Sequence, residues 1–365
     1  MRVLTVNAGS SSLKLGLLGG DDALEEQAEL EVGDDGIDVG QLSRLLGDWA
    51  APDAVGHRIV HGGTRFPAAT RITAEVEDQL RDLTDLAPLH QPKSLAALDA
   101  VSRVFPGVPA VACFDTAFHA TIPAAAATYA VPRAWRTRYG IRRYGFHGLS
   151  HAYCSRRAAE LVGRPLAASR IVTAHLGAGA SLAAVRDGRS VDTTMGFTPL
   201  EGLVMATRSG SVDPGLVLWL EEHEHLAPHE IAAALERESG LLALTGSADM
   251  RAVEAAVDRG DTDAQLGLDV YIHRLVAGIA AMTAALGGID VLAFTGGVGE
   301  HSPRVRRLAV DRLGYLGFAV GDGNDDVRGD ADVSTSDAAG RTVVVAARED
   351  LQIARETRDL LARRS

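Results

Sequence analysis

Residues 3–18 have the sequence VLTVNAGSSSLKLGLL, and residues 171–185 have the sequence IVTAHLGAGASLAAV. In both stretches an apolar, β-rich run gives way to glycine and other small residues and then resumes, which predicts two strands joined by a tight turn. After the second stretch, Asp187-Gly188 predicts a hairpin turn into a third strand at 190–192. The two copies lie about 170 residues apart. This spacing favours a duplicated structural unit over a chance recurrence.

The rest of the chain alternates between the two periodicities expected of strands and helices. Together they predict an α/β fold of layered sheets and helices. Strands are expected at 54–61, 108–114, 290–295 and 342–346. Helices are expected at 73–87, 94–104, 214–222, 228–238, 261–286 and 349–362. The glycine- and aspartate-rich segment 321–332 is expected to be disordered.

Composition narrows the functional class. The 365 residues suggest two domains, and 48 acidic against 36 basic residues give a net charge of -12. An acidic chain of this kind lacks the broad basic face of a nucleic-acid binder or of an electrostatic membrane binder. Cys113 and Cys154 cannot form a disulfide framework, and the first residues show no signal-peptide pattern. We therefore expect a cytoplasmic protein.

Three glycine-rich turns follow predicted strands, at Gly9, at 177–179 and at 296–299. Glycine allows backbone N–H groups to approach an anion closely, and the third turn is expected to lead into a helix beginning near Ser302. A single such turn is usually an ordinary tight turn, but three of them together with an internal repeat favour phosphate binding. Neither a P-loop nor a dinucleotide-binding glycine motif occurs.

Only two of the 36 basic residues are lysines, Lys14 and Lys93. Lys14 stands in the strand after the first glycine turn, where an ammonium group could meet phosphate oxygens. A solvated strand lysine fits the position equally well.

Histidines cluster in short segments, including the pairs His57/His61 and His147/His151. Neither pair contains the glutamate of a zinc-protease motif, one pair falls on a predicted strand, and Gly148 argues against a helix that carries the other. Neutral histidines that form hydrogen bonds in an active cleft are the preferred interpretation, and a zinc hydrolase is the alternative.

Arg58 and Arg208 stand in apolar or glycine-rich surroundings, where a solvated surface arginine is not expected. Arg142 and Arg143 are further candidates. Asp115 directly follows a predicted buried strand, a place where α/β enzymes put active groups and where a simple capping residue is also common.

Taken in order, nine segments of this sequence resemble the acetokinase family of the actin/hexokinase-like phosphotransferases. They are VNAGSSSLK from Val6, HRIVHGG from His57, APLHQP from Ala87, FDTAFH from Phe114, RRYGFHGLSH from Arg142, HLGAGAS from His175, DTTMGFTPLEGLV from Asp192, TRSGSVDPG from Thr207 and FTGGVGEH from Phe294.

The resemblance implies reversible transfer of the ATP γ-phosphoryl group to acetate, giving acetyl phosphate and ADP, with Mg²⁺ (or Mn²⁺) as the metal. It implies two duplicated RNase H-like domains with the active site in the cleft between them. The expected domains are residues 1–119 plus 352–365 on the substrate side and 120–351 on the nucleotide side. The family also implies a homodimer.

Residue roles follow from the resemblance alone. Arg58 would hold the substrate carboxylate, Asp115 would be the catalytic acidic residue, and His147 and Arg208 would steady the transferring phosphoryl group. Asn7 and Glu349 would lie on the metal side. The apolar substrate pocket would consist of Val60, Leu89, Phe146 and Pro199. ATP would be held by His175, Leu176, Gly177, Ala178, Gly179, Asp249, Met250, Arg251, Gly297, Val298, Gly299, Glu300 and His301. Lys14 is added to this set because of its place after the first glycine turn, not because of the resemblance.

This chemistry suits the residue types. A carboxylic acid with a pKa of about 4 to 5 is already ionised at neutral pH, so the nucleophile needs no general base. The difficulty is to bring an anion up to a polyanion, which calls for cations and positioning. We therefore expect Asp115 to orient Arg58 or a metal-bound water, rather than to act as an acid or base.

Three positions differ from the usual family pattern: Ala178 and His301 each stand where asparagine is common, and Ser211 where aspartate is common. These differences bear on nucleotide affinity and acyl preference. The alternatives that remain are a propionate or butyrate kinase of the same family and a non-catalytic, actin-like nucleotide-binding protein.

Overall fold

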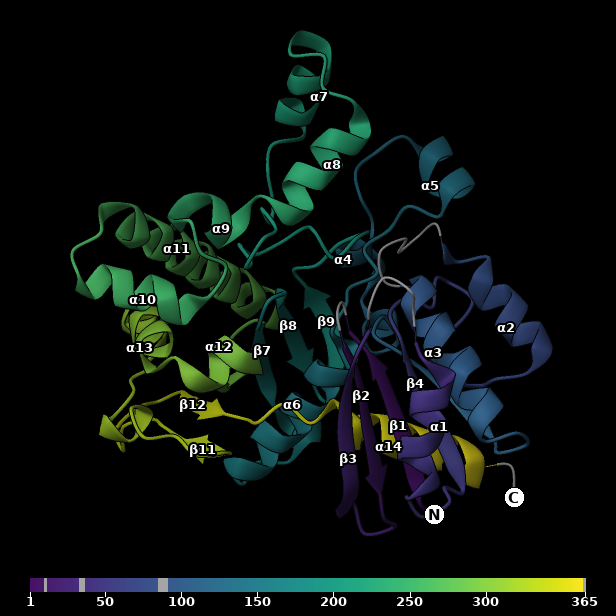
Figure 1. Ribbon diagram of the computed structural model, residues 1–365. Coiled ribbons are helices and arrows are strands. Elements are labelled where there is room, and N and C mark those ends of the chain that lie inside the picture. Colours follow the sequence, from purple (N-terminus) through teal and green to yellow (C-terminus); the bar gives the residue numbers. More distant parts are fainter. Residues whose placement is uncertain (10–11, 33–36, 85–90, 364–365) are drawn as a thin grey trace. The chain divides into compact units, whose positions relative to one another are not determined.

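The computed structural model describes residues 1–9, 12–32, 37–84 and 91–363. Contacts within the chain group them into two units (Figure 1). Unit 1 comprises 1–120, 146–153 and 348–365, and unit 2 comprises 121–145 and 154–347. The domain boundaries expected at 119/120 and 351/352 stay predictions.

Unit 1 contains a six-stranded sheet in the order β3-β2-β1-β4-β6-β5. Its strands are β1 (Val3–Ala8), β2 (Ser12–Leu18), β3 (Leu24–Glu31), β4 (Ala54–Ile59), β5 (Thr70–Arg71) and β6 (Ala110–Phe114). β1, β2 and β3 form an antiparallel meander, β1, β4 and β6 are parallel, and β5 pairs antiparallel with β6.

Helices cover both faces of this sheet. They are α1 (Val39–Gly47), α2 (Ala74–Arg81), α3 (Gln91–Val104) and α14 (Glu349–Ala362), together with the 3-10 turn η2 (Ala117–Thr121). Val55 packs in one core cluster with Ala97 and Val101 of α3, whereas the next residue, Gly56, faces Ile353 of α14. Successive strand residues point to opposite faces, so α3 and α14 lie on opposite sides of the sheet.

Unit 2 repeats the arrangement with the order β9-β8-β7-β10-β12-β11. Its strands are β7 (Arg170–Leu176), β8 (Ala180–Arg186), β9 (Arg189–Thr193), β10 (Val291–Thr295), β11 (Ala331–Asp332) and β12 (Arg341–Val344). Again three antiparallel strands precede two parallel ones, and an antiparallel strand closes the edge. The duplicated α/β topology predicted from the two glycine-containing hairpins is therefore confirmed.

The helices of unit 2 are mostly in its last two thirds. They are α4 (Ala124–Ala127), α5 (Arg133–Tyr139), α7 (Pro214–His223), α8 (Pro228–Arg237), α9 (Gly240–Thr245), α10 (Met250–Asp258), α11 (Thr262–Leu286), α12 (Gly296–His301) and α13 (Pro303–Asp311), with the 3-10 turns η3 (Leu166–Ala168), η4 (Gly314–Leu316) and η5 (Asp322–Asn324). α6 (Gly148–Leu161) begins in unit 1 and ends in unit 2.

α11 is the one helix in the described ranges that is long and apolar enough to cross a membrane. It packs instead on β7, β8 and β9 and on the neighbouring helices α9, α10 and α13. Asp261 caps its N-terminus by accepting hydrogen bonds from the backbone N–H groups of Asp263 and Ala264. α11 therefore serves as a packing helix of unit 2.

Two expectations about local structure are wrong. The turn after β10 is itself a short helix, α12, because Gly296 adopts a φ of 80° and places the chain directly into a helical turn. The segment expected to be disordered, 321–332, forms η5 and β11, since the buried Asn324 side chain accepts a hydrogen bond from Arg306 at 2.7 Å. The buried hydrogen bond of Asn324 thus orders a segment whose composition predicts disorder.

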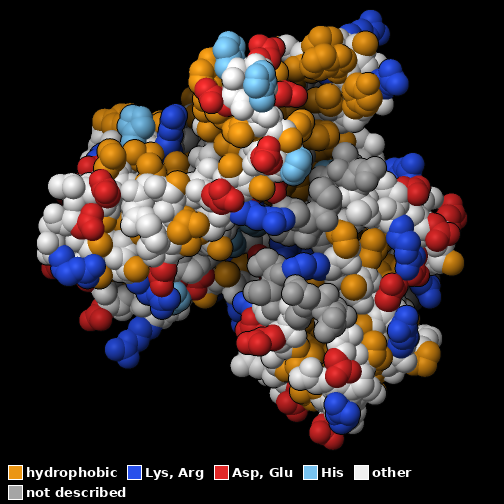
Figure 2. Space-filling model, turned by 45° about the horizontal axis from the view of Figure 1, so that its top comes forward, with side chains coloured by type: hydrophobic (Ala, Val, Ile, Leu, Met, Phe, Trp, Pro, Cys, Tyr) orange, Lys and Arg blue, Asp and Glu red, His pale blue; other side chains and the backbone are white. Residues whose placement is uncertain are grey.

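α7 leaves its apolar side chains in solvent. None of its residues is buried, and Leu216, Leu218 and Trp219 are 45%, 57% and 46% exposed. Figure 2 shows hydrophobic side chains beside histidines at the top of the view, over the region of α7 and α8. An apolar helix face of this kind in a folded unit marks an interaction surface.

We expect Gly56→Ala to loosen the packing of α14 on the sheet. A Cβ atom at this position would lie 2.5 Å from both Ile353 Cγ2 and Thr357 Oγ1, so the helix must shift. Overpacking of this kind costs about 1–3 kcal/mol of unfolding free energy, which urea titration can measure. Gly47→Ala, with no atom within 4 Å of the added carbon, is the control, and equal losses for the two variants would contradict the prediction.

Candidate active site

Three side chains named from the sequence gather at the carboxyl ends of the parallel strands of unit 1. Asn7 lies near the end of β1, Arg58 near the end of β4, and Asp115 directly after β6. The parallel register sets Val6 beside His57 and Arg58 beside Cys113, so these three strands end together. This edge of a parallel sheet is where α/β proteins bind ligands.

Arg58 and Asp115 form a bidentate ion pair. The Nη2 atom of Arg58 donates to Asp115 Oδ2 at 2.6 Å, and Nε lies 3.1 Å from both carboxylate oxygens. The Asp115 side chain is only 2% exposed and that of Arg58 is 16% exposed. Burial disfavours the charged form of both side chains, and it raises the pKa of Asp115. For Arg58 the Asp115 and Glu349 carboxylates outweigh burial, so its pKa is raised. Because a guanidinium always carries its proton, the pair consists of a fixed cation held by a carboxylate with both oxygens engaged.

Asn7 links this pair to the C-terminal helix. Its Oδ1 accepts a hydrogen bond from Arg58 Nη1 at 3.0 Å, and its Nδ2 donates to Glu349 Oε2 at 2.8 Å. Glu349 is the first residue of α14, so a contact between positions 342 residues apart closes this end of the sheet. Arg58 thus lies between Asp115 and Asn7, and Glu349 reaches the same group of side chains.

His147 sits in a left-handed backbone conformation with a φ of 56°. The next residue, Gly148, donates its backbone N–H to Asp115 O at 2.8 Å, and a Cβ atom on Gly148 would lie 2.1 Å from that oxygen. Only glycine permits this close approach, which ties His147 to the backbone of Asp115. Contrary to expectation, Gly148 does not prevent a helix here: it begins α6, and His151 lies in the first turn of that helix.

The four residues expected to form the apolar substrate pocket do not all lie in the same unit. Val60 and Phe146 are buried in unit 1, where the Phe146 ring meets His61 edge-on at 5.4 Å between centroids. Pro199 belongs to unit 2, and Leu89 lies outside the described residues. Val60 and Phe146 are therefore the two of these four residues that the structure describes in unit 1.

In unit 2, two glycine-rich turns lie at the ends of neighbouring parallel strands, as the candidate residues of unit 1 do. β7 and β10 are parallel neighbours with His175 beside Thr295, so the turn 177–179 and α12 follow adjacent strand ends. Gly296 can have no Cβ atom, because it would lie 2.8 Å from Leu176 O, and its N–H donates to Glu300 Oε1 at 2.9 Å. Two of the three predicted anion-binding turns therefore share one sheet edge.

The exposure of the candidate nucleotide residues varies. Ala178, Gly297 and His301 are exposed, Gly299 is buried, and His175, Leu176, Gly177, Gly179, Val298 and Glu300 are buried or partly buried. Asp249 and Arg251 form an exposed ion pair at 2.7 Å, and Met250 between them is buried. Ser211 accepts a hydrogen bond from Gly202 N at 3.1 Å.

Arg208 is partly buried in unit 2 and has a defined orientation. Its Nη1 donates to Pro199 O at 3.1 Å and lies 3.9 Å from Met205 Sδ. Burial lowers the pKa of Arg208 from its very high ordinary value, and Glu236 opposes that shift, so the side chain stays cationic at neutral pH. One carbonyl contact leaves most guanidinium donors of Arg208 available to an anion.

Lys14 is exposed on β2, directly opposite Asn7 in the antiparallel register. Its neighbour on the other side is Glu29 of β3. The residues 10 and 11 of the first glycine turn lie outside the described residues, so the contacts of this turn remain a prediction.

Histidines of unit 1 are largely withdrawn from water. Burial lowers the pKa of His57 to about 3, that of His61 to about 4 and that of His119 to about 4. Both ring nitrogens of His57 are buried without a hydrogen-bond partner among the described residues. His147 and His151 lie 6.5 Å apart between ring centroids, and no group of three His, Cys, Asp or Glu side chains in the described ranges could hold a metal ion.

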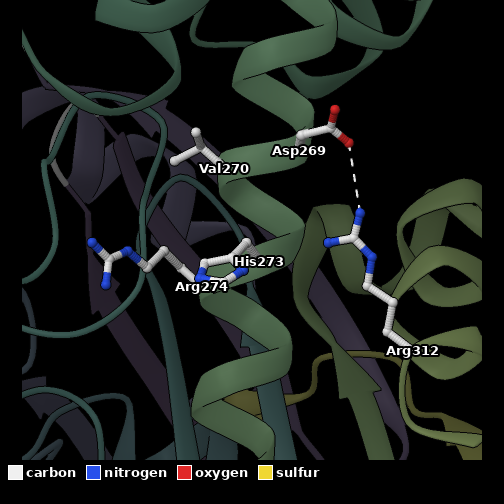
Figure 3. Close-up of a pocket in the computed structure, with 5 residues that line it drawn as sticks. All are labelled: Asp269, Val270, His273, Arg274 and Arg312. Atoms are coloured by element: carbon white, nitrogen blue, oxygen red, sulfur yellow. Dashed lines mark ion pairs between the residues drawn. The ribbon is translucent and has the colours of Figure 1, made fainter.

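A cavity of about 440 Å³ lies away from these residues, on the outer surface of α11. Figure 3 shows its lining, in which Asp269 of α11 faces Arg312 at the end of α13, an ion pair of 3.7 Å. Val270, His273 and Arg274 complete it. None of the candidate residues lines this cavity.

Sequence reasoning missed two side chains that hold candidate segments in place. Arg306 is 1% exposed and donates to the backbone oxygens of Gly299 and Glu300 from beneath α12. Glu201 stands in the segment DTTMGFTPLEGLV and pairs with Arg143 at 2.7 Å. A carboxylate among the apolar residues at the end of that segment was the available signal for Glu201, whereas Arg306 lies in an arginine-rich helix with no signal of its own.

Comparisons with known proteins agree on one family. A family model described as the acetokinase family matches residues 42–355. An acetate kinase of Deinococcus radiodurans is 45% identical over 98% of this chain and 97% of that protein.

Two solved structures are similar over almost the whole chain. The crystal structure of Porphyromonas gingivalis acetate kinase has a TM-score of 0.91 at 36% identity, with 99% of both chains covered. That of a propionate kinase from Francisella tularensis has a TM-score of 0.91 at 33% identity, covering 98% of this chain and 99% of that one.

The buried histidines predict a loss of stability in mild acid. Their folded pKa values lie below the ordinary value of about 6.5, so the unfolded chain takes up protons first as the pH falls. Stability is complete above about pH 6.5 and declines below it, by about 1 kcal/mol per histidine between pH 7.5 and 5.5.

His57→Leu should remove one such contribution, because it replaces a ring whose two buried nitrogens have no partner among the described residues. Urea unfolding at the two pH values measures the difference. The exposed-residue variant His223→Gln is the control. A pH dependence in His57→Leu equal to that of the wild type would refute this role of His57.

Proposed function

The chain belongs to the acetokinase family, and we propose that it transfers the γ-phosphoryl group of ATP reversibly to acetate, forming acetyl phosphate and ADP. The observation that carries the proposal is the Arg58–Asp115 pair at the carboxyl ends of the parallel strands of unit 1. A buried cation held rigidly at this edge suits a small carboxylate as the phosphoryl acceptor. An acetate kinase and a propionate kinase are both among the similar structures.

Arg58 binds the acceptor carboxylate. Asp115 fixes its guanidinium through Nε and Nη2, and Asn7 fixes it through Nη1, so the group is oriented before the substrate arrives. Val60 and Phe146 supply the apolar surface for the methyl group, and Leu89 and Pro199 are assigned there by family resemblance. Pre-orientation of this kind converts binding energy into correct placement of the attacking oxygen.

The carboxylate oxygen attacks the γ-phosphorus, and the bond from phosphorus to the bridging oxygen of ADP breaks. No proton has to leave the nucleophile, because the acid is already ionised. Asp115 accordingly acts as a positioning carboxylate, with both oxygens engaged by Arg58. Arg208 and His147 stabilise the charge that develops on the phosphoryl oxygens, as donors that are already in place.

The nucleotide is held by unit 2 at the ends of β7 and β10, through His175, the turn 177–179, Asp249–Arg251 and α12, with Lys14 of unit 1 as a further phosphate contact. Exposed Ala178 and His301 replace the asparagines common in the family, so weaker nucleotide binding is expected.

The residues expected on the metal side provide one ligand type that Mg²⁺ prefers, a carboxylate. Mg²⁺ binds one or two protein carboxylates, keeps several waters and takes the rest of its ligands from substrate phosphates. Glu349 provides such a carboxylate, and Asn7, whose Oδ1 is engaged by Arg58, holds Glu349 through Nδ2. Bound Mg²⁺ (or Mn²⁺) would neutralise phosphate charge during the transfer.

Acetate is preferred to longer acids in this proposal, with propionate or butyrate as the alternative. One methylene in an apolar pocket changes the free energy by about 1–3 kcal/mol, so kcat/KM for the three acids separates them. The function itself is tested by an acyl hydroxamate assay with MgATP. Acetyl phosphate formation supports it, and no acyl phosphate from any short acid would favour the non-catalytic, nucleotide-binding alternative.

The protein is proposed to be a cytoplasmic homodimer with no nucleic-acid or membrane partner. The exposed apolar face of α7, formed by Leu216, Leu218 and Trp219, is the surface that a second copy would cover. Stable dimers bury apolar patches of this kind at their centre.

Asp115→Asn tests whether the negative charge of this residue matters. The amide offers one acceptor and directs an N–H₂ group at Arg58, so the guanidinium loses its fixed orientation. We expect kcat/KM for acetate to fall about 100-fold. Asp82→Asn, at an exposed ion pair with Arg65, is the control. Near-wild-type turnover with unchanged magnesium dependence would contradict a role for the charge of Asp115.

Leu218→Glu is expected to convert the dimer into a monomer, because it puts a charge on the exposed apolar surface of α7. Light scattering after size-exclusion chromatography measures the molar mass. Leu266→Glu, at an equally exposed leucine of α11, is the matched control. A monomeric wild type, or a Leu218→Glu protein that remains dimeric, would contradict the assignment of this face.

A further inference from the structure

Two side chains of unit 2, Arg143 and Tyr129, contact the segment 194–201 and its last residue, Glu201. Arg143 donates from Nη1 to Thr194 O at 3.0 Å and Met195 O at 3.1 Å, and from Nη2 to Glu201 Oε1 at 2.7 Å. Arg143 thus joins the start of the segment to its end. The Arg143 side chain is 17% exposed and that of Glu201 is 34% exposed, so the pair is shielded from much of the solvent.

Tyr129 completes the group. Its hydroxyl donates to Glu201 Oε2 and accepts a hydrogen bond from Phe197 N at 3.0 Å, while the Arg143 guanidinium lies 5.5 Å from the ring centroid. Burial, followed by the hydrogen bond to Glu201, raises the pKa of Tyr129, so the phenol keeps its proton. Arg143 (through Nη1 and Nη2), Glu201 and Tyr129 are bonded to one another or to the backbone of the segment, and together they are called the brace.

The segment accommodates the brace through Gly196. A Cβ atom on Gly196 would lie 1.7 Å from Glu201 Oε2 and 2.1 Å from Tyr129 OH. Gly196 O also accepts hydrogen bonds from Tyr144 N and Gly145 N at 3.0 and 3.3 Å. The segment is therefore fixed through both its side-chain and its backbone contacts.

The segment in turn holds Arg208. Pro199 O, two residues before Glu201, accepts the hydrogen bond from Arg208 Nη1 at 3.1 Å. The nearby Met205 sulfur, at 3.9 Å, is a weak acceptor, so Pro199 O is the stronger recorded anchor of this guanidinium. A shift of the segment would carry this anchor with it.

We propose that Arg143, Glu201 and Tyr129 are positioning residues for phosphoryl transfer, which fix the segment 194–201 so that Pro199 holds the guanidinium of Arg208 in its working orientation. The inference rests on the role of Arg208 in the proposed function. The brace touches no substrate. It acts by keeping Pro199 O, which accepts the hydrogen bond from Arg208, in place to within a fraction of an ångström. A misplacement of about 1 Å costs about 100-fold in rate.

The test compares Glu201→Gln in two backgrounds. In the otherwise wild-type chain, the amide keeps the shape of Glu201 but loses the charge-assisted bond to Arg143. We expect kcat to fall at least 10-fold, with the KM for ATP changed less than twofold and a nearly unchanged Tm. Arg208→Ala alone should cost more. In the double variant, Glu201→Gln should cost nothing further, because the group it positions is gone.

If Glu201→Gln folds poorly, Tyr129→Phe provides a second test, because this substitution removes only one hydroxyl group. It should lower kcat by a smaller factor, again only when Arg208 is present. Asp330→Asn, at the ion pair with Arg157 elsewhere in unit 2, is the matched control and should leave kcat unchanged.

Two results would overturn the proposal: wild-type kcat in both brace variants, or a loss of the same factor with and without Arg208, which would indicate a general structural role. An Arg208→Ala enzyme with wild-type kcat is a separate outcome, because it contradicts the role of Arg208 itself. The two failures are therefore distinguishable.

Discussion

The ion pair between Arg58 and Asp115 is the interaction on which unit 1 is organised. A guanidinium this deeply placed is tolerated only because a carboxylate engages two of its nitrogens and an amide oxygen a third. Their geometry requires β1, β4 and β6 to end together, requires Gly148 to approach Asp115 without a side chain, and brings Glu349 in from the C-terminal helix. The same arrangement that stabilises the buried charges leaves a fixed cation where a small carboxylate would be bound.

Unit 2 uses the same architecture for a different task. Its sheet has the same strand order, and two of its neighbouring parallel strands, β7 and β10, lead into the glycine-rich turn 177–179 and into α12. The backbone N–H groups of such glycine-rich turns suit phosphates. Duplication followed by this divergence explains how one topology provides both halves of a phosphotransferase.

Much of this could be predicted from the sequence, for physical reasons. The strand-turn-strand repeats and the long helices, such as α11, depend on local patterns that a single chain displays. The helix made by Gly296–His301 and the ordering of 321–332 could not be predicted, because a left-handed glycine and the buried Arg306–Asn324 contact decide them. Among site residues, Arg58 and Asp115 were indicated by their apolar surroundings. Tyr129 gave no signal, since its importance comes entirely from contacts with residues about 70 positions away.

The bond between Asn7 and Glu349 has a consequence for biosynthesis. The unit 1 sheet is complete only when β6 ends at Phe114, and α14 begins at Glu349, so one face of the sheet stays uncovered while more than 230 residues are translated. Gly56 and its neighbours then expose apolar surface that α14 later covers, and nascent chains are prone to association in this period. A chain that lacked α14 would have neither a covered sheet nor the Glu349 carboxylate beside Asn7.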